Sequence, residues 1–310
     1  MGVFVYLPLV LPLTALPIAR LAEQHLHPRS ATHLLVAVGT TLALCSTVCL
    51  ALLMVVGTAQ LPGNPLPDGW SDPEVRAAVP YEEKAGVVAI GVLAAVVVAC
   101  GSALHHHVRQ RIRAARALQS LREQPSAVAV LPDPEPYAYA LPGAPGRVVV
   151  STAMMECLTA RERRALVAHE RAHLTARHHR HLLATQLAAR ANPFLLPLRT
   201  AVAYSTERWA DEAAAQATGD RRAVAGAVGK AALFAHRSPD ALPALAAVGP
   251  IPRRVAALLD PVPPTRLWPP SSAHVAIAGL VATAGTTMSA LSSLNATVTL
   301  VRILHAATPL

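Results

Sequence analysis

The chain has 310 residues, of which 53% are hydrophobic and 15% are charged, and its formal net charge at pH 7 is +9. The hydrophobic fraction exceeds the roughly 45–50% of soluble globular domains, so the composition argues against a purely soluble protein. Many of the arginines cluster directly after one apolar segment, which is typical of a membrane protein rather than of a nucleic-acid-binding one. We therefore expect the lipid bilayer as a partner and no direct contact with nucleic acid.

Four segments carry no Asp, Glu, Lys or Arg, and three of them reach the roughly 20 residues that a helix needs to cross a membrane. These segments are residues 2–19, 32–59, 85–104 and 275–300. The first is borderline in length and contains three prolines. A secretory signal peptide would carry basic residues ahead of its apolar run, and this segment has none, so we interpret it as a retained first span.

The charge distribution predicts which side of the membrane each part occupies, because arginines concentrate on the cytoplasmic side. Five arginines follow the third apolar segment, whereas the loop of residues 60–84 is rich in Asp and Glu, so we place this loop outside. The prediction is a mainly α-helical, four-span protein in three parts. They are residues 1–104 with three transmembrane helices (about 2–19, 32–59 and 85–104) and the outside loop, residues 105–272 as a cytoplasmic domain, and residues 273–310 with a fourth transmembrane helix and a short outside tail.

The predicted cytoplasmic part begins with a basic helix over residues 105–125, which continues out of the membrane. Five prolines between residues 126 and 145 then predict a loop with short extended pieces. Two strand-like runs, Tyr137–Leu141 and Arg147–Ser151, are joined by the turn-forming residues Pro-Gly-Ala-Pro-Gly. This arrangement predicts a β-hairpin.

Helices are predicted to follow the hairpin. Thr159 and Glu162 have the spacing of a capping box, so a helix should start near residue 160 and run through the histidine-rich stretch. The remaining predicted helices cover about 200–218, ended by Gly219, about 220–236, and 253–259 inside a proline-rich linker of residues 238–270.

His169, Glu170 and His173 spell H-E-x-x-H within the capped helix. Side chains four residues apart project from one face of a helix, so both imidazoles point to one place with the Glu170 carboxylate beside it. A catalytic zinc ion takes protein ligands in a tetrahedron and keeps one position open for water. The alternative is a polar helix face that spells the motif by chance. The helix cap and the preceding strand favour the zinc-site interpretation over this alternative, and we expect one zinc ion per chain.

A third protein ligand is needed, and the helix predicted over 200–218 supplies a candidate. Glu207 and Asp211 lie four residues apart and share one face of that helix. Glu207 can complete the zinc site, and Asp211 can then accept the N–H of a zinc-bound histidine. By itself this pair would be an ordinary charged helix face, but its place after the H-E-x-x-H helix favours the metal site. Glu212 falls on another face and is expected in solvent.

The other histidines receive structural interpretations. The group at His105, His106 and His107 lies where the third apolar segment meets the lipid headgroups, and the group at His178, His179 and His181 is predicted to be a polar helix end. The remaining ones are isolated in sequence: His25, His27, His33, His236, His274 and His305.

H-E-R-A-H at residues 169–173, the strand residues 148–151 before it and E-R-W-A-D-E at 207–212 together resemble the BlaR/MecR-type integral membrane zinc metallopeptidases. The three predicted spans before the domain and the one after it also match that family, as does R-R-V-A-A-L-L at 253–259. The resemblance extends over essentially the whole chain, and its specific part is residues 147–212.

This resemblance implies an α+β zincin-like (gluzincin) metallopeptidase domain between spans three and four, in the cytoplasmic (inner) membrane of a bacterial cell. It implies that His169, His173 and Glu207 ligate zinc and that Glu170 is the general base in peptide-bond hydrolysis. Asp211 matches the acidic residue that follows the third ligand. We expect the substrate to add to a strand edge, because backbone pairing aligns a chain without demanding a sequence. The expected strand is Arg147, Val148, Val149, Val150 and Ser151, and the donor to the oxyanion is left open among Tyr204, Arg221, Arg222 and His236.

The best-known members of that family carry a penicillin-binding sensor with an S-x-x-K motif, and this chain has no S-x-x-K. A signal would therefore enter through the 60–84 loop, the spans or a partner protein. The expected substrate is a cytoplasmic protein such as a BlaI/MecI-type repressor, and the oligomeric state is left open, a homo-oligomer included. Two other interpretations are an HtpX-like membrane-protein quality-control protease and a non-catalytic signalling scaffold with structural zinc. The three predicted spans favour the first interpretation over the HtpX-like one, and Glu170 argues against the scaffold.

Overall fold

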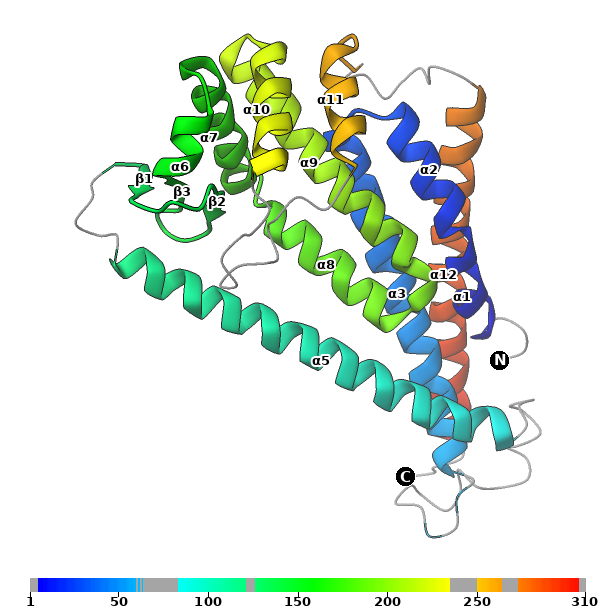
Figure 1. Cartoon of the computed structure of the whole chain (residues 1–310). Helices are drawn as coiled ribbons and strands as arrows, with labels where there is room; N and C mark the ends of the chain where they lie inside the picture. The colour runs from blue at the N-terminus through cyan, green and yellow to red at the C-terminus, as the bar shows by residue number, and fades with distance from the viewer. Residues whose placement is uncertain are drawn as a thin grey trace.

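A computed structural model of the chain describes residues 5–59, 61, 63, 83–120, 126–234, 250–263 and 273–306. Most of these residues are helical, and a three-stranded sheet lies at one side of the helices (Figure 1). Most of the predicted outside loop, much of the 238–270 linker and His236 lie outside the described residues.

The first apolar segment forms three short helical pieces instead of one long helix. They are α1 (Leu7–Val10), the 3-10 helix η2 (Leu11–Thr14) and α2 (Ala15–His25). Pro8 and Pro12 lie in the first turns of α1 and η2, where proline is tolerated. Because proline has no N–H to donate to the preceding turn, a helix does not continue through it without a break. The four-span topology therefore stays a prediction.

Two of the described helices are long and apolar enough to cross a membrane, namely α3 (Pro28–Ala59) and the stretch Ala85–Gln119 of α5 (Glu83–Ser120). A third long helix, α12 (Ala273–Ala306), runs alongside α3 (Figure 1). Residues 105–120 of the predicted basic helix form the end of α5, which passes without a break from the apolar stretch into the arginine-rich one, and residues 121–125 lie outside the described residues.

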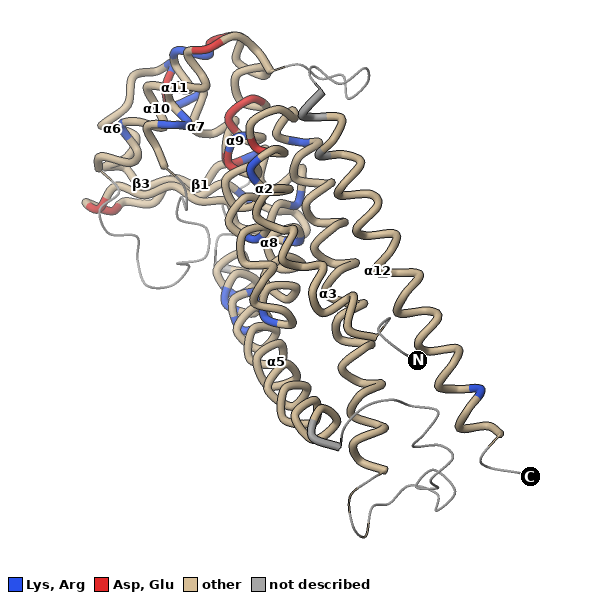
Figure 2. Tube along the Cα trace, turned by 90° about the vertical axis from the view of Figure 1, so that its right-hand side faces the viewer, with Lys and Arg blue, Asp and Glu red and all other residues tan. Residues whose placement is uncertain are grey.

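The apolar side chains of α5 are largely exposed. Val88 is 62% exposed, Val97 is 63% exposed and Val98 is 71% exposed, whereas the core helix of a soluble protein would bury such residues. Figure 2 shows that most of the charged residues gather in the upper part of the molecule, while the apolar stretches of α3 and α5, residues 32–59 and 85–104, carry none. A bilayer would cover this exposed apolar surface.

The sheet confirms the predicted hairpin and adds one strand to it. β2 (Ala138–Leu141) pairs antiparallel with β3 (Arg147–Ser151), as expected from the sequence. The additional strand, β1 (Val128–Leu131), pairs parallel with the other side of β3. The strand order is β1-β3-β2, so β3 is the central strand.

Six helices follow the sheet in the described part of the domain. They are α6 (Thr152–Cys157), α7 (Ala160–Thr175), α8 (His178–Ala191), α9 (Leu196–Thr218), α10 (Arg221–Phe234) and α11 (Ile251–Leu259), with the 3-10 helix η4 (Pro193–Leu195) before α9. The capping box predicted at the start of α7 is confirmed, because the Thr159 hydroxyl accepts from the Glu162 backbone N–H and the Glu162 carboxylate accepts from the Thr159 N–H. Gly219 ends α9 with a positive φ of 66°, which glycine adopts without strain.

The turn between α7 and α8 depends on one residue in an unusual conformation. Arg177 has a φ of 53°, in the left-handed region that a non-glycine residue adopts only at some cost. This turn lets α8 start only three residues after α7 ends, so the first residue of α8 folds back toward the end of α7. The sequence did not predict α8 as a separate helix.

We predict that Gly57→Ala destabilises the packing of α3 against α5. A Cβ at residue 57 would collide with the backbone of Gly86, which cannot yield as a flexible side chain would. Overpacking of this kind costs about 1–3 kcal/mol, so the variant should unfold at a lower temperature in detergent. Gly91→Ala is the matched control on α5, because a Cβ there meets nothing within 4 Å. Equal midpoints for the two variants would show that α3 and α5 do not meet at Gly57.

Candidate metal centre

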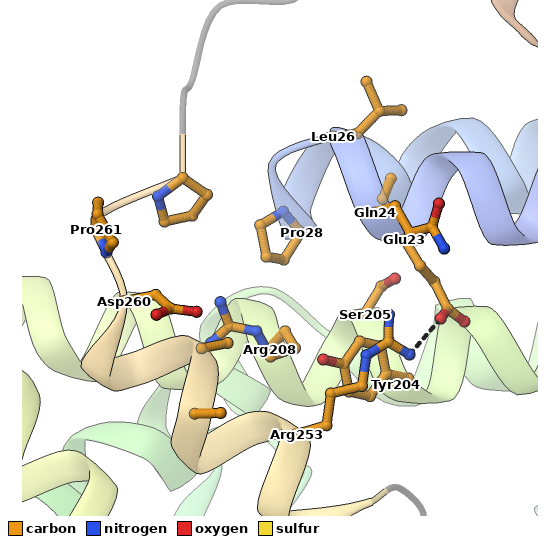
Figure 3. A pocket seen from close by; sticks show the side chains of 14 residues that line it. Glu23, Gln24, Leu26, Pro28, Tyr204, Ser205, Arg208, Arg253, Asp260 and Pro261 are labelled. Atoms are coloured by element: carbon orange, nitrogen blue, oxygen red, sulfur yellow. Dashed lines mark hydrogen bonds and ion pairs between the residues drawn. The ribbon is translucent and has the colours of Figure 1, made fainter. Parts of the chain in front are cut away.

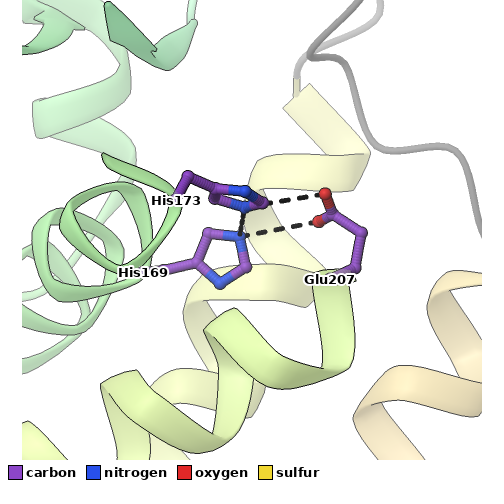
Figure 4. A group of neighbouring side chains, drawn as sticks. All are labelled: His169, His173 and Glu207. Atoms are coloured by element: carbon purple, nitrogen blue, oxygen red, sulfur yellow. Dashed lines mark hydrogen bonds and ion pairs between the residues drawn. The ribbon is translucent and has the colours of Figure 1, made fainter. Parts of the chain in front are cut away.

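The histidines of H-E-x-x-H converge on one point. His169 and His173 both extend from α7, and their Nε2 atoms lie 3.1 Å apart, facing the carboxylate of Glu207 on α9 (Figure 4). The Nε2 of His169 lies 3.6 Å from Glu207 Oε2, and the Nε2 of His173 lies 3.6 Å from Glu207 Oε1. The structure thus brings together the three residues that the sequence proposed as ligands.

The spacing of these donors fits a zinc ion. Zinc bonds to histidine nitrogen and carboxylate oxygen are about 2.0–2.2 Å long, so the ligands of a tetrahedral site lie about 3.3–3.6 Å apart. The three distances are 3.1, 3.6 and 3.6 Å. Two histidines and one glutamate leave the fourth tetrahedral position open, which is the arrangement of a catalytic rather than a structural zinc site.

Asp211 holds the outer side of His169. Its Oδ1 lies 3.1 Å from His169 Nδ1, and its side chain is fully buried. A proton on Nδ1 leaves Nε2 as the lone-pair donor that faces His173 and Glu207. Asp211 therefore lies where the sequence placed it, beside a histidine of the candidate metal site.

Arg254 of α11 joins the two carboxylates. Its Nε and Nη2 donate to the two oxygens of Asp211 at 2.9 and 2.7 Å, and its Nη1 lies 2.9 Å from Glu207 Oε2. Arg254 is only 2% exposed, so these contacts are made away from water. Arg254 belongs to the R-R-V-A-A-L-L motif of residues 253–259, to which the sequence assigned no role. Local spacing in the sequence does not reveal its contacts with Asp211 and Glu207.

His178 supports the second imidazole. As the first residue of α8 it is buried, and its Nδ1 lies 2.9 Å from the Nδ1 of His173. The prediction that His178 belongs to a polar helix end is wrong, because the turn at Arg177 folds it back onto α7. When His173 carries its proton on Nδ1, this N–H donates a hydrogen bond to the Nδ1 of His178. The Nε2 of His173 then keeps a lone pair for a metal.

The two histidines of the cluster differ in their pKa values. Burial lowers the pKa of His173 to about 4. Burial alone would also lower the pKa of His169, but its interactions with Asp211 and Glu207 outweigh burial and raise this pKa to about 10. At neutral pH His173 is therefore neutral, and a metal must displace a proton from His169, so metal affinity falls as the pH falls.

Both carboxylates that face the histidines are ionised. Burial acts to raise the pKa of Glu207, but His173, His169 and Arg254 together hold it well below its ordinary value. Burial likewise acts to raise the pKa of Asp211, and Arg254 and His169 lower it on balance. The cluster thus presents the negative charge that a divalent cation requires.

Glu170 differs from these two acids. Burial raises the pKa of its carboxyl group to about 7, although the charges of His169 and Arg254 and the backbone N–H of Ala140 act in the opposite direction. A carboxylate with a pKa near neutrality can both take up and release a proton at physiological pH. Its neighbour Ala140 belongs to β2, so β2 is the strand that borders the site.

Three expectations from the sequence need correction. The predicted substrate strand, Arg147 to Ser151, is β3, whose two edges are already paired with β1 and β2. Glu212 is buried instead of solvated, and it pairs with Arg208 and Arg221. Arg221 was one of the four candidates for the donor to the oxyanion. It also donates to the carbonyls of Ala257 and Leu258, so its guanidinium is already engaged at α11.

We predict that the purified protein holds one zinc ion per chain. Replacing any of His169, His173 or Glu207 with Ala should remove most of it, because each would supply one of the three ligands that the described residues bring together. Metal analysis after dialysis measures the loss, and His179→Ala is a matched control in the same histidine-rich stretch. Full zinc in all three variants would contradict the assignment.

Comparison with known proteins agrees with this chemistry. Residues 102–190 match the family model of Peptidase family M48. No curated protein and no solved structure matches the chain. The matched region contains H-E-x-x-H and ends before Glu207, Asp211 and Arg254, which the structure adds to the site. The match supports an M48-family metallopeptidase, and the narrower BlaR/MecR type stays a prediction.

Proposed function

We propose that the protein is a membrane-embedded zinc endopeptidase that cleaves a cytoplasmic protein close to the membrane surface. The observation that carries this proposal is the convergence of His169, His173 and Glu207, with the Glu170 carboxyl beside them. A structural zinc site would have no use for an acid whose pKa is poised near 7 next to its ligands. The match to Peptidase family M48 supports the same activity.

His169, His173 and Glu207 would hold the zinc ion, which when bound supplies a Lewis acid for the scissile carbonyl and lowers the pKa of a bound water. Glu170 takes the proton of the attacking water and then gives it to the leaving amine. Asp211 and His178 keep the Nδ1 protons of the two histidines in place, so that both Nε2 atoms face inward. Arg254 holds Glu207 and Asp211 in fixed orientations.

The substrate would pair with β2, which takes the role predicted for β3. Tyr137, just before β2, pairs with Ser151 of β3, and backbone groups alternate in direction along a strand. The backbone groups of Ala138 and Ala140 therefore point away from β3, toward the side where Ala140 meets Glu170. Among the described strands β2 has this edge unpaired, so an extended peptide can add there and pass Glu170.

We place the peptidase domain on the cytoplasmic side of the inner membrane of a bacterial cell. The apolar stretch of α5 continues into Arg109, Arg111 and Arg113, all exposed, as the cytoplasmic end of a span does. Since α5 is one helix, the start of the domain is tied directly to this span.

Within this activity we propose a signal-responsive peptidase whose substrate is a transcriptional repressor of the BlaI/MecI type. The support is the sequence resemblance to BlaR/MecR-type enzymes. An HtpX-like quality-control role shares the same chemistry and differs in substrates, which would be many damaged membrane proteins. Identification of trapped substrates separates these roles.

We predict that Glu170→Gln yields a folded, zinc-loaded, inactive protein. Glutamine keeps the shape but cannot accept a proton, and loss of a general base costs about 10²–10⁴ in rate. Proteomics of cells with the wild-type or the variant protein should show substrates that accumulate only with the variant. A single DNA-binding repressor supports regulation, and many membrane proteins support quality control. Unchanged cleavage by the variant would falsify the role of Glu170.

We predict that Ala138→Pro raises KM for an extended peptide while the sheet persists. Its N–H points away from β3, so proline removes no bond of the sheet but takes away one donor from the substrate edge. The matched control is Val130→Pro on β1, the opposite edge, which should leave KM unchanged. If both variants bind and cleave the peptide as the wild type does, the substrate does not pair with β2.

We predict that a cysteine introduced at position 116 is protected from a membrane-impermeant thiol reagent in intact cells, whereas one at position 70 reacts. The reason is the arginine-rich end of α5, which the positive-inside rule assigns to the cytoplasm. Permeabilised cells provide the control for accessibility. Comparable labelling of both positions in intact cells would reject the proposed topology.

A further inference from the structure

The turn between α8 and α9 lies against the middle of the apolar helix α3 (Figure 1). The Asn192 side-chain amide donates to the Ser46 hydroxyl at 3.1 Å, and Ser46 lies halfway along the apolar segment of residues 32–59. Near the end of α8, the Leu187 carbonyl accepts from the Cys100 thiol of α5 at 3.7 Å. The 3-10 helix η4 in the turn also contacts η2, which belongs to the first apolar segment. Three of the four apolar segments therefore contact the hairpin of α8 and α9 at or near its turn.

We refer to residues 192–197 of this turn as the hairpin tip, and none of its backbone N–H groups needs water. Pro193 and Pro197 have no N–H. The other four N–H groups donate within the protein: Asn192 to the Ala188 carbonyl, Phe194 to the Asn192 side chain, Leu195 to the Asn192 carbonyl and Leu196 to the Pro193 carbonyl. A turn in water has no such requirement, whereas backbone donors in the hydrocarbon region must be satisfied by the protein itself. The tip thus meets this condition for contact with lipid.

Two large apolar side chains of the hairpin tip are exposed. Phe194 is 53% exposed and Leu196 is 50% exposed. Their neighbours Leu195 and Leu198 are each 1% exposed and belong to a core cluster with Leu42 of α3. Exposed apolar residues are common on soluble proteins, so the exposure alone does not require lipid. Here it coincides with a tip whose backbone donors are satisfied and with adjacent apolar segments, and acyl chains would cover both side chains.

The charges on the hairpin near its tip are all positive. The chain has no Asp or Glu between Glu170 and Glu207. Arg190 precedes the tip, Arg199 follows it, and both are exposed. An arginine near a bilayer keeps its apolar stem among the acyl chains and extends its guanidinium to the phosphate groups of the lipids. The two arginines therefore fit the headgroup level on either side of the tip.

Farther along α9 the surroundings become ionic. Arg208 lines a cavity of about 340 Å³ between α2, α9 and α11, together with Glu23 of α2 and Arg253 of α11 (Figure 3). Glu23 and Arg253 form an ion pair at 2.7 Å. Such groups belong on the water side of a membrane surface, because charges are costly in hydrocarbon. α9 thus changes from an apolar start at Leu196 to a charged middle, as a helix that leaves a bilayer does.

We propose that the hairpin tip inserts into the cytoplasmic leaflet of the membrane, with Phe194 and Leu196 among the acyl chains and Arg190 and Arg199 at the headgroups. The partner is the phospholipid leaflet itself rather than one bound lipid molecule. This inference rests on the membrane placement proposed above, and it adds a membrane contact beyond the spanning helices.

Insertion of the tip would fix the height of the candidate metal centre above the membrane. α8 begins with His178, which contacts His173, and α9 carries Glu207 eleven residues after Leu196. Eleven residues of α-helix span about 16 Å. The site is then held close to the inserted tip, so a peptide bond reaches it where the substrate chain comes near the bilayer.

Site-directed spin labelling of the full-length protein in vesicles of phosphatidylethanolamine and phosphatidylglycerol tests the proposal. Cysteines are introduced one at a time in a chain whose four native cysteines are replaced by alanine. Power saturation compares the label's accessibility to oxygen, which concentrates among acyl chains, with its accessibility to a water-soluble nickel chelate. The label of Phe194→Cys should have an oxygen-to-nickel ratio severalfold above that of Leu259→Cys. Leu259 is the matched control, because it is also an exposed apolar residue but ends α11.

A label in Val97→Cys, on the exposed apolar stretch of α5, separates failure of this inference from failure of the membrane placement. A nickel-accessible label at position 194 with an oxygen-accessible label at position 97 overturns insertion of the tip and leaves the span intact. Nickel access at both positions overturns the membrane placement and the insertion together. Equal ratios at positions 194 and 259 likewise contradict insertion.

The label of Arg199→Cys tests the proposed depth. Arg199 lies three residues after Leu196 on α9, toward the headgroups, so its ratio should fall between those of Phe194→Cys and Leu259→Cys. A ratio at position 199 equal to or above that at position 194 would contradict the placement of this arginine at the headgroups.

Discussion

The candidate metal centre depends on one buried guanidinium, that of Arg254. Arg254 contacts Asp211 and Glu207 together, so one cation fixes both the third ligand and the carboxylate that orients His169. Removing one partner of a buried ion pair usually costs about 3–5 kcal/mol, because the remaining charge is left without compensation. The three carboxylate–cation contacts also tie α11 to α9. The site is thus assembled from α7, α9 and α11, and the last of these contributes no ligand.

Helix α9 is charged on two sides, and each side has its own partner. Glu207 and Asp211 face the candidate metal centre, while Arg208 pairs with Glu212, which also pairs with Arg221 of α10. Such a helix cannot be recognised from a hydrophobic stripe, because its buried faces are partly ionic. Its buried charges are paired, as burial in an apolar surrounding requires. α9 therefore connects the candidate site to α10 through a second set of buried charges.

Local patterns in the sequence predicted those parts of the molecule that depend on neighbouring residues. The capping box at Thr159, the i and i+4 spacing of His169 and His173, and the stop at Gly219 all act within one or two helical turns. The pair Glu207 and Asp211 was found because it repeats the same spacing on another helix. In contrast, Arg254 and Asp211 are 43 residues apart in sequence, and nothing in either stretch specifies the pairing. His178 was misjudged because a left-handed turn at Arg177, a residue that rarely adopts it, sends the chain back. β3 was taken as the substrate strand because β1 was not recognised.

If the apolar stretch of α5 spans a bilayer, the unbroken course of this helix links the bilayer to the sheet. Ala114, Ala117 and Leu118, near one end of this helix, pack with Leu141 and Val149 of the sheet, while the other end carries the apolar stretch. At about 1.5 Å per residue, 38 residues form a rod of about 57 Å. A span adjusts to a thicker or thinner bilayer by tilting, and a tilt of about 5° moves the far end of such a rod by roughly 5 Å. Leu141 of β2 lies at that far end. In a bilayer, such a tilt would therefore displace the sheet that borders Glu170.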